Sequence, residues 1–215
     1  MSIVVGRDLR ASFGPVRHQG KRPTCLAFAV SDLHAALRGA WVDLSCEYLF
    51  YMAQKRALRP PTKGTTLSAS LSSLSLDGQP EEAGWPYLPV LPTPLSLWQP
   101  PSSVGALYTR NGATAAPGVA QVVAALDAGR PAIVLMKLSK SFYKPTSAGI
   151  VDAGSEEKPE DDRRHAVIAV GHGHVGSHLS VLVRNSWGVK WAQGGYAWVT
   201  ERYLTPRIFN MALMA

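Results

Sequence analysis

The sequence predicts an α+β protein, in which most helices come first along the chain and strands follow. Before residue 80, apolar side chains recur at the three- and four-residue spacing of a helix. After residue 130, short runs rich in β-branched and aromatic residues are bounded by turn residues, as is typical of strands. Helices and strands that are segregated along the chain indicate the α+β class. The predicted helices are 25–39, 44–53, 66–76 and 119–128, and the predicted strands are 132–138, 166–170, 179–184 and 195–199.

A proline-rich connector separates the helices from the strands. Proline fixes the backbone φ angle and cannot continue a helix, so this stretch is expected to be stiff and extended. We therefore expect a single domain, 1–215, built from a helical lobe (1–105), a β-rich lobe (106–204) and a C-terminal segment (205–215) that returns across it. The prolines of the connector are Pro89, Pro92, Pro94, Pro100 and Pro101.

Capping residues mark the ends of the first two helices. Thr24 precedes the first helix and is expected at its N-cap, and Gly39 marks its end. The second helix has Asp43 or Ser45 as its cap.

The composition is that of an ordinary globular protein. Apolar residues make up 46% and charged residues 17% of the 215 residues, which excludes an intrinsically disordered chain. No apolar run approaches the roughly 20 residues of a membrane helix, and residues 1–10 lack the apolar stretch of a secretory signal. The two cysteines argue against a disulfide framework. We expect a cytoplasmic, reducing location and no membrane partner, with secretion by a route without a signal peptide left open.

The net charge of +7 is scattered along the chain. Nucleic-acid binding would need clustered lysines and arginines with interleaved aromatic residues, so we expect no nucleic-acid partner. His172 and His174 have the spacing of two metal ligands, but no third cysteine or paired carboxylate stands at ligand spacing. The segment 171–179, which also contains His178, is expected to be a surface turn. We predict no metal and no cofactor.

Cys25 opens the first predicted helix and gives the clearest chemical signal. A thiol in the first turn of a helix meets the positive end of the helix dipole, which favours the thiolate. Taken alone, a cysteine in an apolar helix is more often a small buried residue, and that is our interpretation of Cys46. Cys25 differs because polar residues in other segments can complete a nucleophile site: Gln19, His165 and Asn185.

Ordered motifs surround these residues. They are Gln19-Gly20 with Cys25-Leu26-Ala27-Phe28, Asp43-Leu44-Ser45 with Gly64-Thr65, His165-Ala166-Val167, and Asn185-Ser186-Trp187-Gly188. In this order they resemble the papain-like cysteine peptidases, over about residues 13–204.

The resemblance implies a papain-like two-lobe fold, with a helical lobe, an antiparallel β-barrel-like lobe and an active-site cleft between them. It implies that Cys25 is the nucleophile, His165 the general acid/base and Asn185 the residue that orients His165. Gln19 would donate to the oxyanion, and Trp187 would cover the hydrogen bond between His165 and Asn185.

The same resemblance places substrate-binding residues at Gly64, Thr65, Arg164 and Trp187. Arg164 ends a charged loop, 152–164, which fits solvated surface and the rim of the leaving-group side equally well.

The sequence departs from the family pattern beside the nucleophile. Arg22 stands where the family usually has a cysteine, so the usual disulfide is missing, and Cys25 and Cys46 are both expected to be reduced thiols. Arg22 and Pro23 are expected along the floor of the cleft. Cys25 lies too near Met1 to leave room for the family's prosegment, so we expect a protein regulator or inhibitor in its place.

The implied function is that of an endopeptidase, which hydrolyses peptide bonds in peptide or protein substrates through an acyl-enzyme on Cys25. The same thiol, imidazole and amide also support acyl transfer, deamidation or isopeptide cleavage. A further alternative is a catalytically silent binding module with the papain fold, which the altered residues 22–26 keep open.

Overall fold

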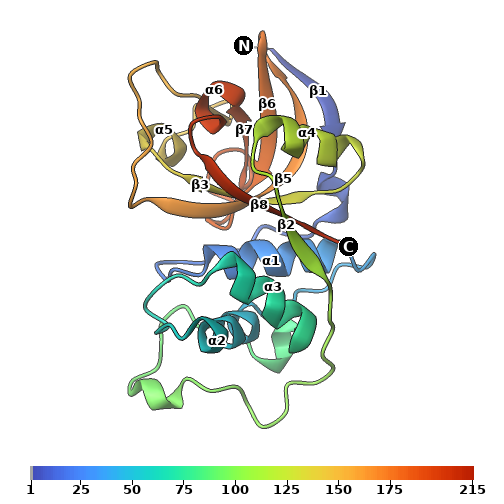
Figure 1. Ribbon diagram of the computed structural model, residues 1–215, viewed down its shortest axis with the longest axis vertical. Helices are drawn as coiled ribbons and strands as arrows, with labels where there is room; N and C mark the ends of the chain where they lie inside the picture. Colours follow the sequence, from blue (N-terminus) through green and yellow to red (C-terminus); the bar gives the residue numbers. More distant parts are fainter. Residues whose placement is uncertain (1) are drawn as a thin grey trace. The chain divides into compact units, whose positions relative to one another are not determined.

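A computed structural model describes residues 2–215 and divides the chain into two compact units (Figure 1). The strand-rich unit comprises the described residues up to His18 together with Thr114–Leu213. The helical unit comprises Gln19–Ala113 with Met214 and Ala215. Each unit has its own hydrophobic cluster, and the α+β class predicted from the sequence is confirmed.

A mostly antiparallel sheet forms the strand-rich unit. Its strand order is β2-β8-β3-β5-β6-β7-β4, and β1 pairs with the second half of β5. β4 and β7 pair in parallel, whereas β5 pairs antiparallel with β1, β3 and β6. The sheet is open, with the short strands β2 and β4 at its two ends, so the predicted barrel-like closure is wrong. The strands are β1 (Ile3–Asp8), β2 (Gly112–Ala115), β3 (Ala132–Lys137), β4 (Ile150–Val151), β5 (Arg164–Val175), β6 (His178–Arg184), β7 (Tyr196–Thr200) and β8 (Ile208–Met214).

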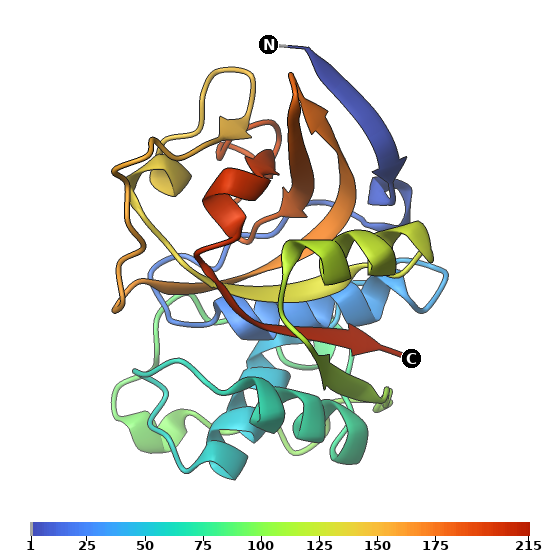
Figure 2. The ribbon, with the colours of Figure 1, turned by 45° about the horizontal axis from the view of Figure 1, so that its top comes forward.

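β5 is the central strand of this unit because it pairs with three others. It is longer than the predicted strand 166–170, and it pairs with β3 along its first half and with β1 along its second. Figure 2 shows β1, in blue, beside the far half of β5. Residues 165–171 are buried throughout, which explains the continuous apolar run in the sequence. The helices of this unit are α4 (Val119–Asp127), α5 (Lys140–Tyr143) and α6 (Glu201–Leu204).

The histidine-rich segment is strand, and the prediction of a surface turn over 171–179 is wrong. His172 and His174 belong to β5, and His178 opens β6. Glycine is usually a weak strand former, but here it lets β1 approach closely: a Cβ atom on Gly173 would lie 2.2 Å from the carbonyl oxygen of Val4.

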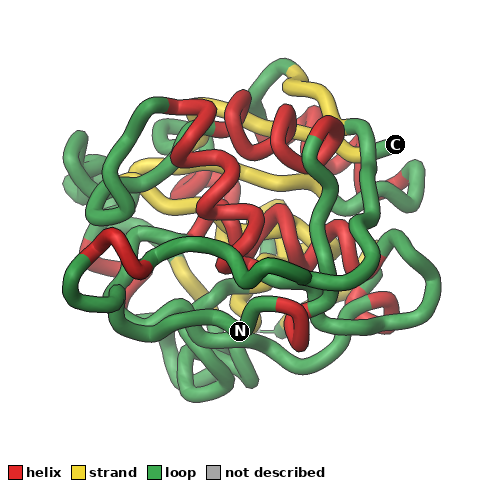
Figure 3. Tube along the Cα trace, turned by 90° about the horizontal axis from the view of Figure 1, so that it is seen from below, coloured by secondary structure: helices red, strands yellow, loops and turns green. Residues whose placement is uncertain are grey.

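Three helices form the core of the helical unit: α1 (Cys25–Ala36), α2 (Cys46–Ala57) and α3 (Leu67–Leu76). Every residue of α1 after Cys25 is buried, including the polar residues Ser31, Asp32 and His34. Figure 3 shows long loops, in green, between the helices, in red. Within residues 2–215, no helix has the length and apolar character needed to cross a membrane.

The predicted cap of α2 is confirmed at Ser45, α3 has a cap at Thr66 that was not predicted, and the predicted cap of α1 differs. The hydroxyl oxygens of Ser45 and Thr66 each accept the backbone N–H of the residue three positions later. Thr24 occupies the N-cap position of α1 but makes no capping hydrogen bond. Its hydroxyl lies instead 2.9 Å from the hydroxyl of Tyr87.

The boundaries of the units differ from the predicted lobes. The residues up to His18, predicted in the helical lobe, belong to the strand-rich unit because β1 pairs with β5. The change of unit along the chain falls at Ala113, after the proline-rich connector. The C-terminal segment is not a simple return, because Ile208–Met214 forms β8 and pairs with β3.

A buried histidine joins the helices of the helical unit. His34 of α1 is 1% exposed, and its Nδ1 lies 3.1 Å from Oε1 of Gln79. The amide nitrogen of Gln79 donates to the carbonyl of Ser45 at 2.9 Å and bonds the hydroxyl of Ser31, so Nδ1 of His34 must carry the proton toward Oε1. Burial lowers the pKa of His34 from 6.5 to about 4, against the effect of the Gln79 hydrogen bond and with help from nearby arginines.

We expect His34 to make the folded protein less stable in acid. Because its folded pKa lies below its unfolded pKa, its contribution is fully present above about pH 6.5 and is lost as the pH falls toward about 4, where the unfolded chain has taken up the proton. The pKa difference corresponds to about 3 kcal/mol of unfolding free energy. His34→Gln should therefore lose about 3 kcal/mol less than wild type over this range, measured by urea unfolding at each pH.

The control is His178→Gln, since His178 is exposed. The same pH dependence in wild type and in His34→Gln would contradict the expectation.

Candidate active site

The structure brings His165 and Asn185 together within the strand-rich unit. His165 is the second residue of β5, and Asn185 directly follows the neighbouring strand β6. Nε2 of His165 lies 2.7 Å from Oδ1 of Asn185, and the two residues are 5% and 2% exposed. The predicted pair is formed in a buried place, while its catalytic role stays a prediction at this stage.

The hydrogen bonds of Asn185 decide which nitrogen of His165 carries the proton. The backbone N–H of Ser186 donates to Oδ1 of Asn185 at 2.8 Å, so the atom at this position must be the amide oxygen. The same oxygen faces His165, which therefore donates from Nε2–H. In the neutral ring, the lone pair is then on Nδ1. Nδ2 of Asn185 is buried and has no hydrogen-bond partner among residues 2–215. The orientation of the amide is therefore fixed by the hydrogen bonds that Oδ1 accepts.

Local backbone geometry explains the Asn-Ser-Trp-Gly motif. The backbone N–H of Asn185 donates to the carbonyl of Gly195 at 3.0 Å, and that of Gly188 donates to the carbonyl of Arg17 at 3.1 Å. Gly188 has a φ of +76°, and a Cβ atom there would lie 2.7 Å from Cδ2 of His18. Only glycine fits this position without strain, so the chain can turn directly after Trp187.

Aromatic rings cover the buried pair. The ring of Trp187 lies 4.7 Å from that of His165, and the ring of Phe142 contacts both, at 5.8 Å from His165 and 5.4 Å from Trp187. Tyr143 stacks on Trp187 at 5.5 Å and is 44% exposed. Trp187 takes the covering position that the sequence predicts. Phe142 and Tyr143 were not predicted, because they lie in α5, a four-residue helix with no periodic signal.

Burial controls the protonation of His165. It lowers the pKa of His165 to about 4, and the hydrogen bond to Asn185 acts in the opposite direction without restoring the ordinary value. The imidazole of this unit is therefore neutral near pH 7. Its cation forms at neutral pH only if an anion is brought close to it.

Cys25 lies in the helical unit as the first residue of α1, and it is half-buried. No acidic residue stands in the first turn of this helix, so the helix dipole favours the thiolate without an opposing carboxylate. Cys46, in α2, is 0% exposed. Both cysteines are thiols and not halves of a disulfide, as the sequence predicts.

Gln19 is held in the turn before α1. It is buried, and its Nε2 donates to the backbone carbonyl of Arg22 at 2.9 Å. The hydroxyl of Tyr87 donates to the backbone carbonyl of Gln19 at 2.6 Å. The structure thus places Gln19 in the same short segment as Cys25, with both its side chain and its backbone hydrogen-bonded.

The expectation that Arg22 lines the floor of a cleft is wrong. Its side chain is 6% exposed inside the helical unit, where it forms an ion pair with Glu47 at 2.6 Å. Glu47 was missed by sequence reasoning. The signal that could have found it is the arginine itself, because a buried arginine in an apolar setting requires a buried counter-ion.

Gly64 and Thr65 lie beside the turn that precedes α1. A Cβ atom on Gly64 would lie 3.7 Å from the carbonyl of Pro23, and Arg59 donates to the carbonyl of Gly64 at 2.7 Å. Oγ1 of Thr65 is buried without a hydrogen-bond partner in the described part of the chain. Substrate binding by these two residues stays a prediction.

The side chain of Arg164 is separated from His165. The two are consecutive residues of β5, so their side chains point to opposite faces of the strand. The guanidinium of Arg164 lies 5.6 Å from the ring of Phe209, and its Nε donates to the carbonyl of Asp161. A substrate role for Arg164 stays a prediction, and its surroundings are those of a surface side chain.

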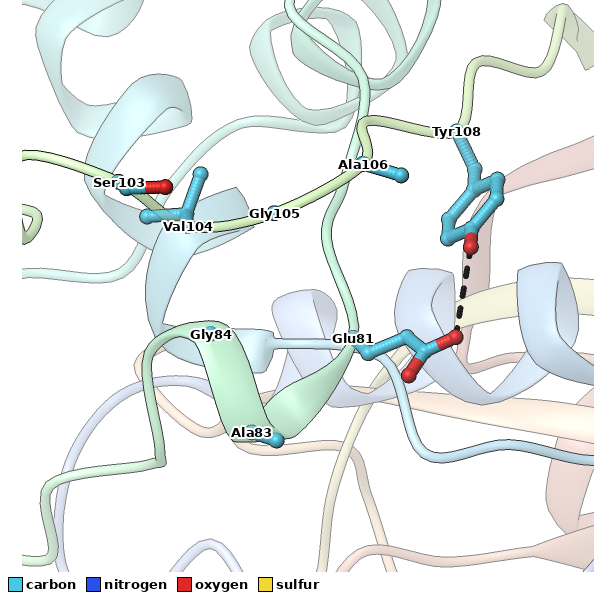
Figure 4. A pocket seen from close by; sticks show the side chains of 8 residues that line it. All are labelled: Glu81, Ala83, Gly84, Ser103, Val104, Gly105, Ala106 and Tyr108. Carbon is cyan, nitrogen blue, oxygen red and sulfur yellow. Dashed lines mark hydrogen bonds between the residues drawn. The ribbon is translucent and has the colours of Figure 1, made fainter.

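Two other features lie outside the candidate site. Nε2 of His172 lies 2.7 Å from Oδ1 of Asp127 and is thus engaged at the surface of the strand-rich unit. A pocket of about 490 Å³ opens in the helical unit between Glu82–Gly84 and the segment 103–108, where Tyr108 bonds Glu81 (Figure 4). The residues that line it include no thiol or imidazole.

The comparisons with known proteins identify the family. Residues 6–213 match the family described as papain family cysteine protease, and the chain therefore belongs to that family. Among solved structures, xylellain, a cysteine protease from Xylella fastidiosa, is 20% identical with a TM-score of 0.83, over 99% of this chain and 86% of that one. The Carica candamarcensis cysteine protease in complex with E-64 is 20% identical with a TM-score of 0.73, over 97% and 96%. These likenesses confirm the predicted papain-like fold.

Curated relatives are similar in sequence but longer. Pro-cathepsin H of Mus musculus is 27% identical over 186 residues, which cover 85% of this chain and 55% of the relative. A cysteine protease of Blomia tropicalis is 24% identical over 219 residues, which cover 96% of this chain and 63% of the relative. The chain thus spans little more than half the length of these relatives.

We expect Asn185→Ala to remove the tautomer preference of His165, because the acceptor that holds the proton on Nε2 is deleted. Nitrogen NMR of ring-labelled histidine reports which nitrogen is protonated. In wild type the neutral ring of His165 should carry its proton on Nε2. In Asn185→Ala both tautomers should be populated.

Asn210→Ala is the control, because Asn210 lies in β8 and bonds the backbone of Met211. A wild-type ring protonated on Nδ1 would show that the assignment of the Asn185 amide is wrong.

Proposed function

We propose that the chain is a thiol-dependent endopeptidase that hydrolyses peptide bonds in peptide or protein substrates. Membership of the papain family supports the class of reaction. The observation that carries the proposal is the buried hydrogen bond from His165 to Asn185, which leaves Nδ1 of a shielded imidazole as the atom that exchanges protons.

In this proposal Cys25 is the nucleophile. Its thiolate attacks the carbonyl carbon of the substrate, a C–S bond forms, and the carbonyl oxygen takes the negative charge. The imidazolium of His165 then gives its proton to the leaving amine as the C–N bond breaks, which leaves an acyl-enzyme. A water molecule, deprotonated by the now neutral His165, releases the acid and regenerates the thiolate.

The low pKa of His165 supports its pairing with an anion. An imidazole buried among aromatic rings is neutral near pH 7, yet the leaving amine needs a proton donor. A thiolate beside the ring would stabilise the imidazolium by Coulomb attraction, and the imidazolium would stabilise the thiolate in turn. The helix terminus at Cys25 contributes to the same charge balance.

Gln19 acts on the oxyanion in this proposal. One N–H of its amide is bonded to the carbonyl of Arg22, which fixes the plane of the group. The second N–H, together with the backbone N–H of Cys25, is the candidate donor to the tetrahedral oxygen. Loss of one such donor typically costs about 2.7–4 kcal/mol of transition-state stabilisation.

We also propose substrate-binding and regulatory roles. Gly64, Thr65 and Trp187 bind substrate beside the reacting groups. A protein regulator or inhibitor controls access, and the active protein is kept in a reducing environment because an exposed thiolate is readily oxidised.

Cys25→Ser should abolish turnover of a peptide library, because the attacking atom is lost, while Cys46→Ala should keep most of the activity, because Cys46 is fully buried in α2. Mass spectrometry of the products measures both. An inactive Cys46→Ala beside an active Cys25→Ser would show that the nucleophile is assigned wrongly.

The same spectra separate the alternative reactions. Hydrolysis adds one water to the summed masses of two product peptides, deamidation changes a side-chain amide into an acid, and acyl transfer joins the acyl part to an added amine. The alternative of a catalytically silent binding module would be favoured by two results together. Wild type would react with none of the substrates, and Cys25 would be alkylated no faster than an ordinary thiol.

The pKa of His165 should depend on Cys25. In Cys25→Ala, where no thiolate is available, proton NMR should show His165 titrating near the value of about 4 that burial imposes. In wild type the pKa should be well above this, so the imidazolium persists at neutral pH. Cys46→Ala is the matched control and should behave as wild type. Equal pKa values in wild type and Cys25→Ala would rule out the ion pair.

A further inference from the structure

A buried ion pair lies directly behind the segment of Gln19 and Cys25. Nη1 and Nη2 of Arg22 donate to the two carboxylate oxygens of Glu47 at 2.6 and 2.9 Å. Glu47 is 0% exposed and Arg22 is 6% exposed. A two-pronged pair of this kind fixes the orientation of both groups, and a buried one cannot be replaced by water if it opens.

Further donors fix the carboxylate of Glu47. The indole Nε1 of Trp98 donates to Oε1 at 2.6 Å, and the backbone N–H of Leu88 donates to Oε2 at 3.0 Å. Both donors come from the proline-rich connector. Glu47 itself is in the first turn of α2, so one carboxylate joins this helix, the connector and Arg22.

The guanidinium of Arg22 is confined on its other sides. It lies 5.5 Å from the ring of Phe50 and 5.1 Å from the ring of Tyr87, and Nη1 also donates to the carbonyl of Leu88 at 2.5 Å. Arginine forms such stacked, forked contacts far better than lysine does. The side chain of Arg22 is thus held by contacts on several sides in the helical unit.

The backbone of Arg22 connects this cluster with Gln19. The carbonyl of Arg22 accepts from Nε2 of Gln19 and from the backbone N–H of Thr24, each at 2.9 Å. Because the side chain of Arg22 is held in place, its backbone carbonyl is held as well. This carbonyl accepts from Gln19 and therefore sets the plane of the Gln19 amide.

We propose that Arg22 and Glu47 are positioning residues, which hold the Gln19 amide where it meets the oxyanion. The inference rests on the proposed function, in which Gln19 is an oxyanion donor. Neither Arg22 nor Glu47 touches substrate; they act through the Arg22 carbonyl. The ion pair thereby makes the geometry of the oxyanion donor independent of any disulfide in the helical unit, where both cysteines are thiols.

The test is a double-mutant cycle between Arg22→Lys and Gln19→Ala. Lysine keeps the charge but cannot bridge both oxygens of Glu47, so kcat for a peptide substrate should fall by about 10-fold to about 100-fold with little change in KM. Alkylation of Cys25 by iodoacetamide, which needs no oxyanion donor, should proceed at the wild-type rate. In the Gln19→Ala background the same substitution should change kcat by less than about 2-fold.

Arg56→Lys is the matched control. Arg56 forms a similarly forked pair with Asp77 in the same unit, at 2.9 and 2.7 Å, but at an exposed site. Its kcat and alkylation rate should equal those of wild type.

A second variant keeps the test decisive if Arg22→Lys does not fold. Arg22→Met combined with Glu47→Leu removes both charges from the buried site, which is often tolerated, and it should show the same loss of kcat with unchanged alkylation. An equal loss of kcat in the presence and absence of Gln19, or slowed alkylation, would overturn the positioning role. A Gln19→Ala variant as active as wild type would instead refute the oxyanion role in the proposed function.

Discussion

The hydrogen bond between His165 and Asn185 is the constraint around which the strand-rich unit is arranged. It joins the start of β5 to the end of β6, and the turn at Gly188 brings Trp187 over it. Because the imidazole is buried, its charged form is costly, and its protonation depends on what anion is brought to it. This makes a buried histidine useful as a proton donor that is charged only in the presence of its partner. The rest of the proposed chemistry follows from that dependence.

The helical unit meets a different requirement, which is to hold a short irregular segment in one conformation. In Gln19–Cys25, the side chain of Arg22 is anchored on Glu47, and the carbonyl of Arg22 accepts a hydrogen bond from the side chain of Gln19. A buried ion pair is poor evidence of stability, since apolar residues often serve as well. Here the ion pair matters for orientation, because its forked geometry fixes the direction in which the backbone carbonyl of Arg22 points.

Residue patterns predicted what depends on local periodicity and residue type, and they failed where tertiary pairing decides. The three helices of the helical unit and the strand carrying His165 were predicted correctly. The pairing of His165 with Asn185 was implied by the family resemblance and not by the pattern, and the two side chains lie 2.7 Å apart. β1 was missed because it is an exposed edge strand without alternation of apolar residues. The extension of β5 through His172 and His174 was missed because glycine is usually a weak strand former, whereas here Gly171 and Gly173 lie where β1 approaches closely. The Arg22–Glu47 pair joins residues far apart in sequence, and nothing in the spacing indicates it.

In the proposed mechanism, Cys25 of the helical unit and His165 of the strand-rich unit form a thiolate–imidazolium pair. The most direct measurement is the pH dependence of the ultraviolet absorbance of the thiolate, in a Cys46→Ala background where Cys25 is the remaining cysteine. If the pair forms, the thiolate should appear well below the ordinary thiol pKa of about 8.5, and adding His165→Ala should move its formation up toward that value. A thiolate that forms at the same pH with and without His165 would rule out the thiolate–imidazolium pair.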